Sequence, residues 1–229
     1  MNWRNKLSDP ERRKLVQKAS STLWTSEGWD ALKYLKEERG LSESVLKEFQ
    51  VGYVPLRVEH QLRGRIITPI IDPSGDLIAI STRHLHKKKD FWHEDYEKRF
   101  HVYGMQIAKK AILKYQKVAV VEGEFDTLSM HTRGIPFAIG ICGSAFTFFQ
   151  VSLISRYATE IYLLFDGDEG GDTALVRAKK MYYEELEGMV NLIPCKMPRG
   201  YDPDRFIREN GRDELLNLMK QEKLNRVKT

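Results

Sequence analysis

Four short apolar runs alternate with helix-like segments over the second half of the chain. The runs read KVAVVEG, FAIGI, EIYLLFDGD and MVNLIP. Strands separated by helices of roughly ten to fifteen residues indicate βαβ units, because parallel neighbours need a crossover connection. The pattern predicts an α/β fold with a mostly parallel sheet flanked by helices, and the carboxyl ends of its strands form the functional edge.

Acidic motifs follow three of these four predicted strands. They are EGEFD at 122–126, DGD at 166–168 and DPD at 202–204. A parallel sheet brings the carboxyl ends of its strands to one edge, so the three motifs converge there. Carboxylates brought together raise one another's pKa unless cations neutralise their charge. The motifs therefore predict a site for hard divalent cations, with Mg²⁺ as the natural candidate and Mn²⁺ as an alternative.

Each acidic motif also has a simpler interpretation. Asp-Gly-Asp after a strand is often a polar turn, and Asp-Pro-Asp is a common helix start. Glu124 has no fixed place in the pattern and is expected to face solvent. The metal-site prediction depends on the conjunction of three acidic motifs at three strand ends.

The charge of the chain is distributed unevenly. Residues 1–117 contain 23 Lys and Arg against 15 Asp and Glu, whereas residues 118–229 contain 14 against 17. This asymmetry indicates one surface that meets a polyanion and another that gathers carboxylates for cations. Solvated charge without a binding role is the alternative.

The basic half contains signals for three helices and a hairpin. A capping box begins at Ser8. A second helix is expected over 29–39, where Trp29, Leu32 and Leu35 share a face. Ser42 starts a short third helix. The runs RIITPII and LIAISTRHL, joined by DPSGD, then predict a β-hairpin.

Composition excludes several protein classes. Only two cysteines are present, which excludes a disulfide scaffold and a four-thiolate zinc module, so no zinc site is expected. The uncharged stretch 134–155 is interrupted by glycine, proline and polar residues, which favours a strand, a turn and a helix over a membrane span. The N-terminus lacks the apolar core of a secretory signal. A cytoplasmic protein without membrane contact is expected.

The segments VVEGEFDTL, LLFDGDEGGDTA and PRGYDPDRFI together resemble the Toprim domain that primases, topoisomerases and some nucleases share. Over roughly residues 26–210, the chain resembles the RNA polymerase domain of bacterial DnaG-type primases. LRGRIITPIIDPSGDLIAISTR and GICGSAFT belong to this resemblance. It implies a DNA primase that synthesises short RNA primers on single-stranded DNA by two-metal nucleotidyl transfer.

The resemblance also assigns roles to individual residues. The catalytic set that it implies is Glu122, Asp166 and Asp168. The metal ligands that it implies are Glu122, Asp126, Asp166, Asp168, Asp202 and Asp204. The nucleotide- or template-binding positions that it implies are Arg63, Arg65, Arg83 and Lys98, although the family's Pro-Lys-Tyr-Leu-Asn segment is absent here.

The resemblance divides the chain into three parts. They are a basic N-terminal α+β subdomain (1–117), a Toprim catalytic domain (118–204) and a C-terminal helical tail (205–229). The expected partners are single-stranded DNA, ribonucleoside triphosphates and, in trans, a replicative helicase and a zinc-binding module. The family's usual zinc-binding and helicase-binding domains do not fit into 229 residues, which predicts either a compact phage or mobile-element primase or a fragment of a longer one.

Other functions remain open at this stage. A Toprim nuclease is the main alternative, because the same acids hydrolyse phosphodiesters when water replaces the 3′-hydroxyl. A topoisomerase needs a further domain, and a non-catalytic binding module has no need of intact acidic motifs. Four aromatic residues, Phe91, Trp92, Tyr96 and Phe100, are candidate stacking platforms for bases, with core packing as the alternative.

Overall fold

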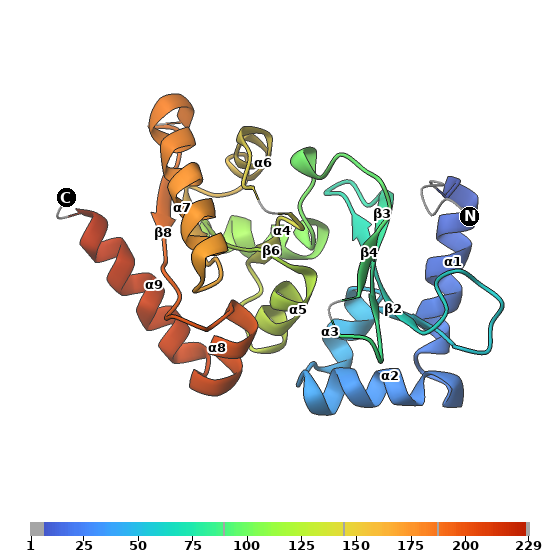
Figure 1. Ribbon diagram of the computed structural model, residues 1–229. Helices are drawn as coiled ribbons and strands as arrows, with labels where there is room; N and C mark the ends of the chain where they lie inside the picture. Colours follow the sequence, from blue (N-terminus) through green and yellow to red (C-terminus); the bar gives the residue numbers. More distant parts are fainter. Residues whose placement is uncertain (1–6, 89, 144, 187, 228–229) are drawn as a thin grey trace. The chain divides into compact units, whose positions relative to one another are not determined.

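The chain forms two compact units, Met1–Tyr96 and Glu97–Thr229, coloured along the sequence in Figure 1. The computed structural model describes residues 7–88, 90–143, 145–186 and 188–227. Each unit has its own sheet: the first is antiparallel and the second is parallel.

The first unit consists of helices followed by an antiparallel sheet of order β1-β2-β3-β4. Its strands are β1 (Gly52–Val54), β2 (Arg65–Ile71), β3 (Leu77–His84) and β4 (Phe91–His93). Its helical elements are α1 (Asp9–Thr22), η1 (Ser26–Gly28), α2 (Trp29–Lys33), the π-helical η2 (Tyr34–Glu38) and α3 (Glu43–Glu48). The three predicted helices and the predicted hairpin are confirmed.

Local hydrogen bonds explain where these elements begin and turn. The Ser8 hydroxyl and N–H both donate to Glu11 Oε2, at 2.6 and 2.9 Å, and thereby cap α1. In the β2–β3 turn, Asp72 Oδ1 accepts N–H bonds from three following residues, and Gly75 adopts a φ of 100°. A residue with a side chain rarely adopts that φ, so the glycine suits the turn.

The predicted buried face of the second helix is wrong in one position. Trp29 is 64% exposed, whereas Ala31 and Leu35 are fully buried. Ala31 and Leu35 are four residues apart and therefore lie on one side of the helix, which faces the core.

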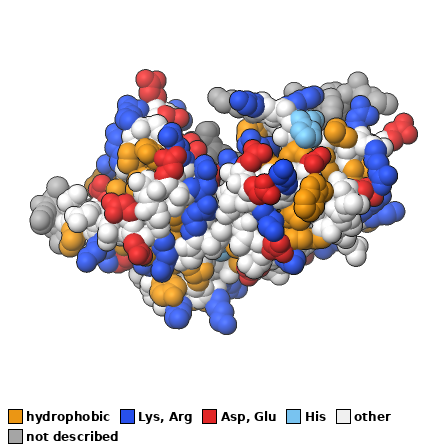
Figure 2. All heavy atoms as spheres, turned by 90° about the horizontal axis from the view of Figure 1, so that it is seen from below, with side chains coloured by type: hydrophobic (Ala, Val, Ile, Leu, Met, Phe, Trp, Pro, Cys, Tyr) orange, Lys and Arg blue, Asp and Glu red, His pale blue; other side chains and the backbone are white. Residues whose placement is uncertain are grey.

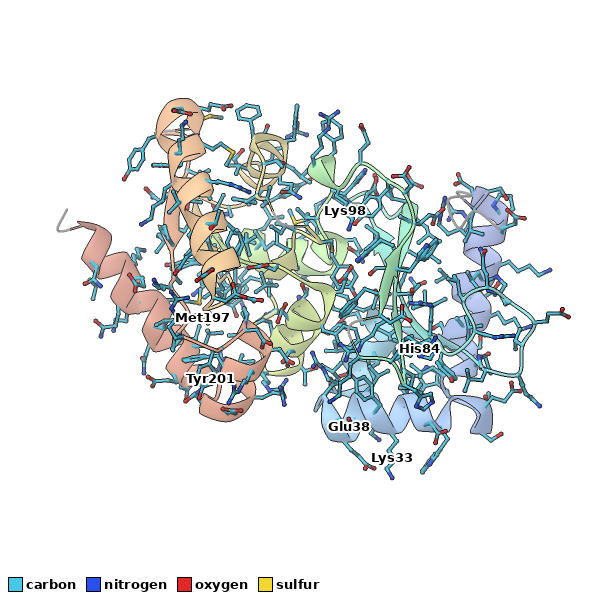
Figure 3. All side chains as sticks on the ribbon, viewed as in Figure 1. Lys33, Glu38, His84, Lys98, Met197 and Tyr201 are labelled. Carbon is cyan, nitrogen blue, oxygen red and sulfur yellow. The ribbon has the colours of Figure 1, made fainter. Side chains whose placement is uncertain are left out.

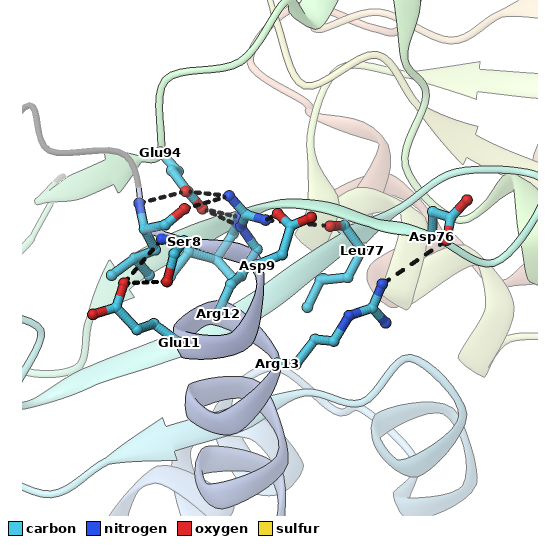
Figure 4. A network of polar contacts seen from close by, with 10 residues as sticks. Ser8, Asp9, Glu11, Arg12, Arg13, Asp76, Leu77 and Glu94 are labelled. Carbon is cyan, nitrogen blue, oxygen red and sulfur yellow. Dashed lines mark hydrogen bonds and ion pairs between the residues drawn. The ribbon is translucent and has the colours of Figure 1, made fainter.

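A buried ion pair connects α1 to the segment after β4 (Figure 4). The Arg12 guanidinium donates to both Glu94 carboxylate oxygens, Nε to Oε2 at 2.8 Å and NH2 to Oε1 at 2.7 Å. Both side chains are about 1–2% exposed. The backbone N–H groups of Leu7 and Ile80 also donate to Glu94. This network fixes the N-terminal helix to the sheet through residues that are more than 80 positions apart in sequence.

The second unit contains a parallel sheet of order β6-β5-β7-β8. Its strands are β5 (Lys117–Val121), β6 (Ala138–Gly140), β7 (Glu160–Leu163) and β8 (Asn191–Pro194). Its helical elements are η3 (Lys98–Phe100), α4 (Met105–Tyr115), α5 (Glu124–Thr132), α6 (Phe148–Ile154), α7 (Glu169–Met181), η4 (Tyr182–Leu186), α8 (Pro203–Asn210) and α9 (Arg212–Val227). The α/β class and the parallel sheet predicted from the sequence are confirmed.

The division between the units falls earlier in the sequence than the expected boundary after residue 117. Helix α4 belongs to the second unit because its buried face, including Met105, Ala108 and Ile112, joins the core of the parallel sheet. The C-terminal helices join the same core through buried residues such as Phe206 and Leu215. The tail is helical as expected, and it packs within the second unit.

The uncharged stretch 134–155 contains β6, a loop and the whole of α6, as expected from its interruptions. None of the helices formed by the described residues combines the length and the apolar character needed to cross a membrane. On the face seen in Figure 2, basic and acidic side chains lie next to each other on each unit. The charge asymmetry of the sequence therefore does not make either unit uniformly basic or acidic on that face.

We predict that Glu94→Ala destabilises the chain by about 3–5 kcal/mol, because it leaves the Arg12 charge buried without its partner. Urea denaturation of the full chain measures this loss. Arg13→Ala is the matched control, since Arg13 is 58% exposed and lies 3.9 Å from Asp76. Its expected cost is within about 0.5 kcal/mol. Equal losses in the two variants would contradict the importance of the buried pair.

Candidate metal-binding and catalytic site

The first and second acidic motifs meet at the carboxyl ends of neighbouring strands. Strands β5 and β7 pair in parallel, so the residues that follow them emerge side by side. The backbone N–H of Asp166 donates to Glu122 Oε1 at 3.1 Å. Both side chains are half-buried. This contact places two of the predicted catalytic carboxylates at one edge of the sheet.

The third motif is joined to the first through Asp126. One carboxylate oxygen of Asp126 accepts the N–H of Gly123, and the other accepts the N–H of Asp204, each at 3.2 Å. Asp126 therefore connects the beginnings of α5 and α8. The predicted convergence of the three motifs is observed through these two links.

Asp168 and Asp202 have a structural role as well as a predicted metal role. Asp168 Oδ1 accepts the N–H of Gly171 at 2.9 Å and caps α7, and Asp202 Oδ1 accepts the N–H of Arg205 at 2.6 Å and caps α8. Both side chains are exposed. The helix-start interpretation of Asp-Pro-Asp is thus correct, and it is compatible with a carboxylate directed to the site edge.

Crowding and burial shift the acidities of these groups. The pKa of Asp166 is raised to about 7, first by burial and then by the charges of Glu122, Asp202 and Asp168. Burial also raises the pKa of Glu122. The pKa of Asp126 lies well above its usual value because of burial and the neighbouring aspartates. Bringing these carboxylates together is unfavourable without a compensating cation.

The residues present fit a divalent cation of the Mg²⁺ type. Asp166 Oδ1 is buried and accepts no hydrogen bond from the described residues. Within those residues, no group of three or more His, Cys, Asp or Glu side chains is arranged so that it could hold a metal ion by itself. Mg²⁺ commonly takes one or two protein carboxylates and completes its shell with water and substrate phosphates. Glu122 and Asp166 match that requirement. Asp168 is close enough for its charge to raise the pKa of Asp166.

Two acids of the motifs differ from the others. Asp204 is buried, and its Oδ1 accepts a bond from Arg208 Nε at 3.1 Å, so an arginine already compensates its charge. Glu124, which was expected to face solvent, is only 9% exposed. It lies in the first turn of α5. Burial raises the pKa of Tyr103, and the charge of Glu124 raises it further.

Two glycines of the second motif allow close backbone approach. A Cβ atom on Gly167 would lie 2.0 Å from the carbonyl oxygen of Pro198, and one on Gly171 would lie 2.0 Å from that of Asp166. No side chain fits at either position without backbone movement. Gly167 lets the loop after β7 contact the loop after β8, and Gly171 lets the start of α7 lie against the segment directly after β7.

The predicted basic residues occupy different environments. Arg63 is exposed. Arg65 is buried and forms an ion pair with Asp90, and its NH1 also donates to Thr82 Oγ1 at 3.3 Å. This burial differs from the expected phosphate-facing position, and it arises because Arg65 lies in the sheet opposite the segment that leads into β4. The Arg83 guanidinium lies over an aromatic ring, 5.3 Å from the centre of Phe91.

The fourth predicted basic residue, Lys98, belongs to the second unit, where Figure 3 labels it. It begins the turn η3, and its carbonyl accepts a hydrogen bond from the Gln150 side chain at 3.1 Å. The other three predicted basic residues belong to the first unit.

Two basic residues at the site edge were missed by the sequence analysis. Lys196 and Arg199 follow β8 in the loop that also contains Met197 and Tyr201 (Figure 3). Both pair with Asp172 of α7, at 2.9 and 3.3 Å. Their signal in the sequence was the segment KMPRG directly after a predicted strand.

We predict that the metal-free chain loses stability as the pH rises from 5 to 8. The pKa of Asp166 is about 7 in the folded chain and about 3.9 in the unfolded chain. Folding therefore takes up a proton, and the stability that this proton contributes is lost as the pH rises through 7. Melting temperatures measured in a chelator should fall over this range, less steeply in Asp166→Asn, and Mg²⁺ should stabilise the wild type most at pH 8.

Asp172→Asn is the control for that experiment. The pKa of Asp172 is lowered by Lys196, so the contribution of this carboxylate to stability changes only below pH 5. The melting temperature of Asp172→Asn from pH 5 to 8 should therefore run parallel to that of the wild type. Parallel profiles for the wild type and Asp166→Asn would contradict the raised pKa of Asp166.

Comparison with known proteins shows which sequences and folds this chain resembles. Residues 119–207 match the sequence model of the family described as Toprim-like. A DNA primase of Aquifex aeolicus is 29% identical over 225 residues, which cover 83% of this chain and 44% of that protein. The chain therefore spans less than half the length of this curated relative.

Solved structures of related proteins share the fold. The structure of a DnaG catalytic core matches with a TM-score of 0.84 at 23% identity, covering 92% of this chain and 78% of the other. A DnaG primase catalytic domain bound to single-stranded DNA matches with a TM-score of 0.82, also at 23% identity, over 92% of this chain and 79% of the other. Residues 119–207 form a Toprim-like domain, within a chain that has the fold of the DnaG primase catalytic core.

Proposed function

We propose that this chain is the catalytic core of a DNA primase and synthesises short RNA primers on single-stranded DNA. The observation that carries the proposal is the pair Glu122 and Asp166 on neighbouring strand ends, with a buried Asp166 oxygen that accepts no bond from the described residues. The similarity to DNA primases over most of the chain supports the same function.

The residues at this edge would have different roles in nucleotidyl transfer. Glu122, Asp166 and Asp168 would hold Mg²⁺, which neutralises phosphate charge and activates the 3′-hydroxyl when bound. The cap that Asp168 makes to α7 orients its carboxylate before substrate binds. Lys196 and Arg199 are candidates for contacts with the triphosphate. Both carry a positive charge at the end of a long side chain, and both pair with Asp172 near the edge.

The remaining predicted partners belong to this proposal. The substrates are single-stranded DNA and ribonucleoside triphosphates, in line with the related catalytic domain that was solved bound to single-stranded DNA. A replicative helicase and a zinc-binding module in trans would supply coupling and template selection. Mg²⁺ as the working ion, a cytoplasmic location and a phage or mobile-element origin stay predictions of the sequence.

We predict that primers form only when template, triphosphates and Mg²⁺ or Mn²⁺ are all present. Asp166→Ala, Asp168→Ala and Glu122→Gln should each reduce synthesis at least about 100-fold, the scale on which losing one group that stabilises transition-state charge acts. Labelled ribonucleotides resolved on a gel measure the products. Asp213→Ala, an exposed carboxyl of α9, is the control and should keep wild-type activity.

Two outcomes of that assay would contradict the proposal. Near-normal synthesis by both aspartate variants would remove the metal assignment. Template shortening without triphosphates, and no new oligonucleotides in their presence, would favour a Toprim nuclease that uses the same acids to activate water.

We predict different effects for the two arginines of the hairpin. Arg63→Ala should weaken single-stranded DNA binding and lower the salt slope of the affinity by about 0.7, the value for one phosphate contact, with unchanged stability. Arg65→Ala should instead destabilise the chain, because it leaves Asp90 without its buried partner. Fluorescence anisotropy and urea denaturation separate the two. An unchanged salt slope in Arg63→Ala would withdraw its phosphate-binding role.

A further inference from the structure

A group of three phenylalanine rings, two of them exposed and one half-buried, lies in the second unit where η3 meets α6. Phe100 and Phe149 pack edge to face with ring centres 4.6 Å apart, and Phe148 follows at 5.9 Å from Phe149. Phe148 is 36% exposed and Phe149 is 47% exposed. We call these three residues the aromatic platform. Large apolar rings left this open to solvent are a recurrent mark of a binding surface.

Hydrogen bonds hold the platform in place from below. The Thr147 hydroxyl donates to the carbonyl of Arg99 at 2.7 Å. The side-chain amide of Gln150, which is 1% exposed, donates to the carbonyls of Lys98 and His101 at 3.1 and 2.8 Å. These bonds join η3 to the start of α6. The rings are therefore preorganised, which reduces the entropy lost when a ligand binds.

Two basic residues directly precede Phe100 of the platform. They are Lys98 and Arg99, and the acidic Glu97 comes before them. The Arg99 guanidinium lies 4.6 Å from the centre of the Phe100 ring. Arg99 also pairs with the exposed Glu97 at 3.2 Å. Ion pairs on the surface contribute little to stability, so a phosphate group can take the place of Glu97.

The loop that leads to Phe148 and Phe149 begins at the edge of the sheet that carries the carboxylates. The loop that leaves the carboxyl end of β6 leads into α6, and β6 is the neighbour of β5. In that loop the N–H of Cys142 donates to the carbonyl of Glu122 at 2.9 Å. A strand lying on the rings would therefore approach the edge where the proposed reaction takes place.

We propose that the aromatic platform stacks the unpaired bases of a single-stranded nucleic acid, with Arg99 contacting its phosphates. Every base has a π-face, so phenylalanine rings bind single strands with little sequence preference, and cationic neighbours add the phosphate contacts. The proposal rests on the proposed function, because the template and the nascent primer are the single strands that a primase holds. Both present the same chemistry to the rings.

Binding of an abasic strand tests the proposal without any turnover. The affinity of the full chain for labelled oligothymidylate, for oligouridylate and for an abasic oligonucleotide of the same length is measured in a chelator without triphosphates. The wild type should bind a base-bearing strand at least about fivefold more tightly than the abasic strand, the lower end of one base–aromatic stack. Equal affinities would overturn the proposal.

Variants assign this base preference to the platform. Phe148→Leu combined with Phe149→Leu keeps apolar side chains but removes two rings, and it should lower the preference at least about fivefold with an unchanged salt slope. Phe149→Tyr keeps a ring and should keep the preference. Tyr183→Leu, which removes an aromatic ring that is 64% exposed elsewhere in the unit, is the matched control. A wild-type preference in the double leucine variant would overturn the proposal.

The experiment distinguishes template from primer as the bound strand, and it distinguishes failure of the platform from failure of the proposed function. Tighter binding of oligothymidylate assigns the platform to the template, and tighter binding of oligouridylate assigns it to the primer; either supports stacking. Wild-type primer synthesis together with no base preference would reject the platform and leave the proposed function intact. A base preference lost in the double variant, with no primer synthesis by the wild type, would support the platform and reject primase activity.

Discussion

The crowding of carboxylates at one edge of the parallel sheet is the constraint on which the rest of the second unit depends. The pairing of β5 with β7 places Glu122 beside Asp166, and Asp126 then joins the start of α5 to the start of α8. Gly167 and Gly171 allow the loops to approach closely enough for these contacts. The carboxylates at this edge therefore repel one another in the folded chain. Burial, and then the charges of its acidic neighbours, raise the pKa of Asp166 to about 7.

Three of the buried charges among the described residues have a partner of opposite charge. Arg12 is paired with Glu94 in the first unit, and Arg65 is paired with Asp90. At the edge itself, Asp204 is paired with Arg208. Asp166 differs because it forms no ion pair with the described residues, and its buried Oδ1 accepts no hydrogen bond from them. A group whose charge is left uncompensated by the protein is where a cation contributes most.

The sequence predicted the parts of the fold that follow from local pattern. Apolar runs between helical segments predicted the parallel sheet, and the acids after those runs predicted its functional edge. The capping box at Ser8 predicted the start of α1, because its hydrogen bonds join residues three apart. The antiparallel hairpin followed from two β-rich runs around DPSGD.

Features that depend on contacts between distant segments could not be predicted. Arg65 meets Asp90 only after β2 and β3 have paired, so an arginine expected at phosphate lies in an internal ion pair. The exposure of Trp29 and the burial of Glu124 depend on which side of each helix meets the core. The role of Gln150 in joining η3 to α6 requires residues about 50 positions apart in sequence.

The most direct test of the edge as a metal site is the position of bound metal. Crystals of the chain grown with Mn²⁺ and a non-hydrolysable ribonucleoside triphosphate give an anomalous signal from the ion. We predict a peak in direct contact with the carboxylates of Glu122 and Asp166, with triphosphate oxygens completing its ligands. An ordered triphosphate with no manganese peak beside these two carboxylates, or manganese held only by other residues, would contradict the account.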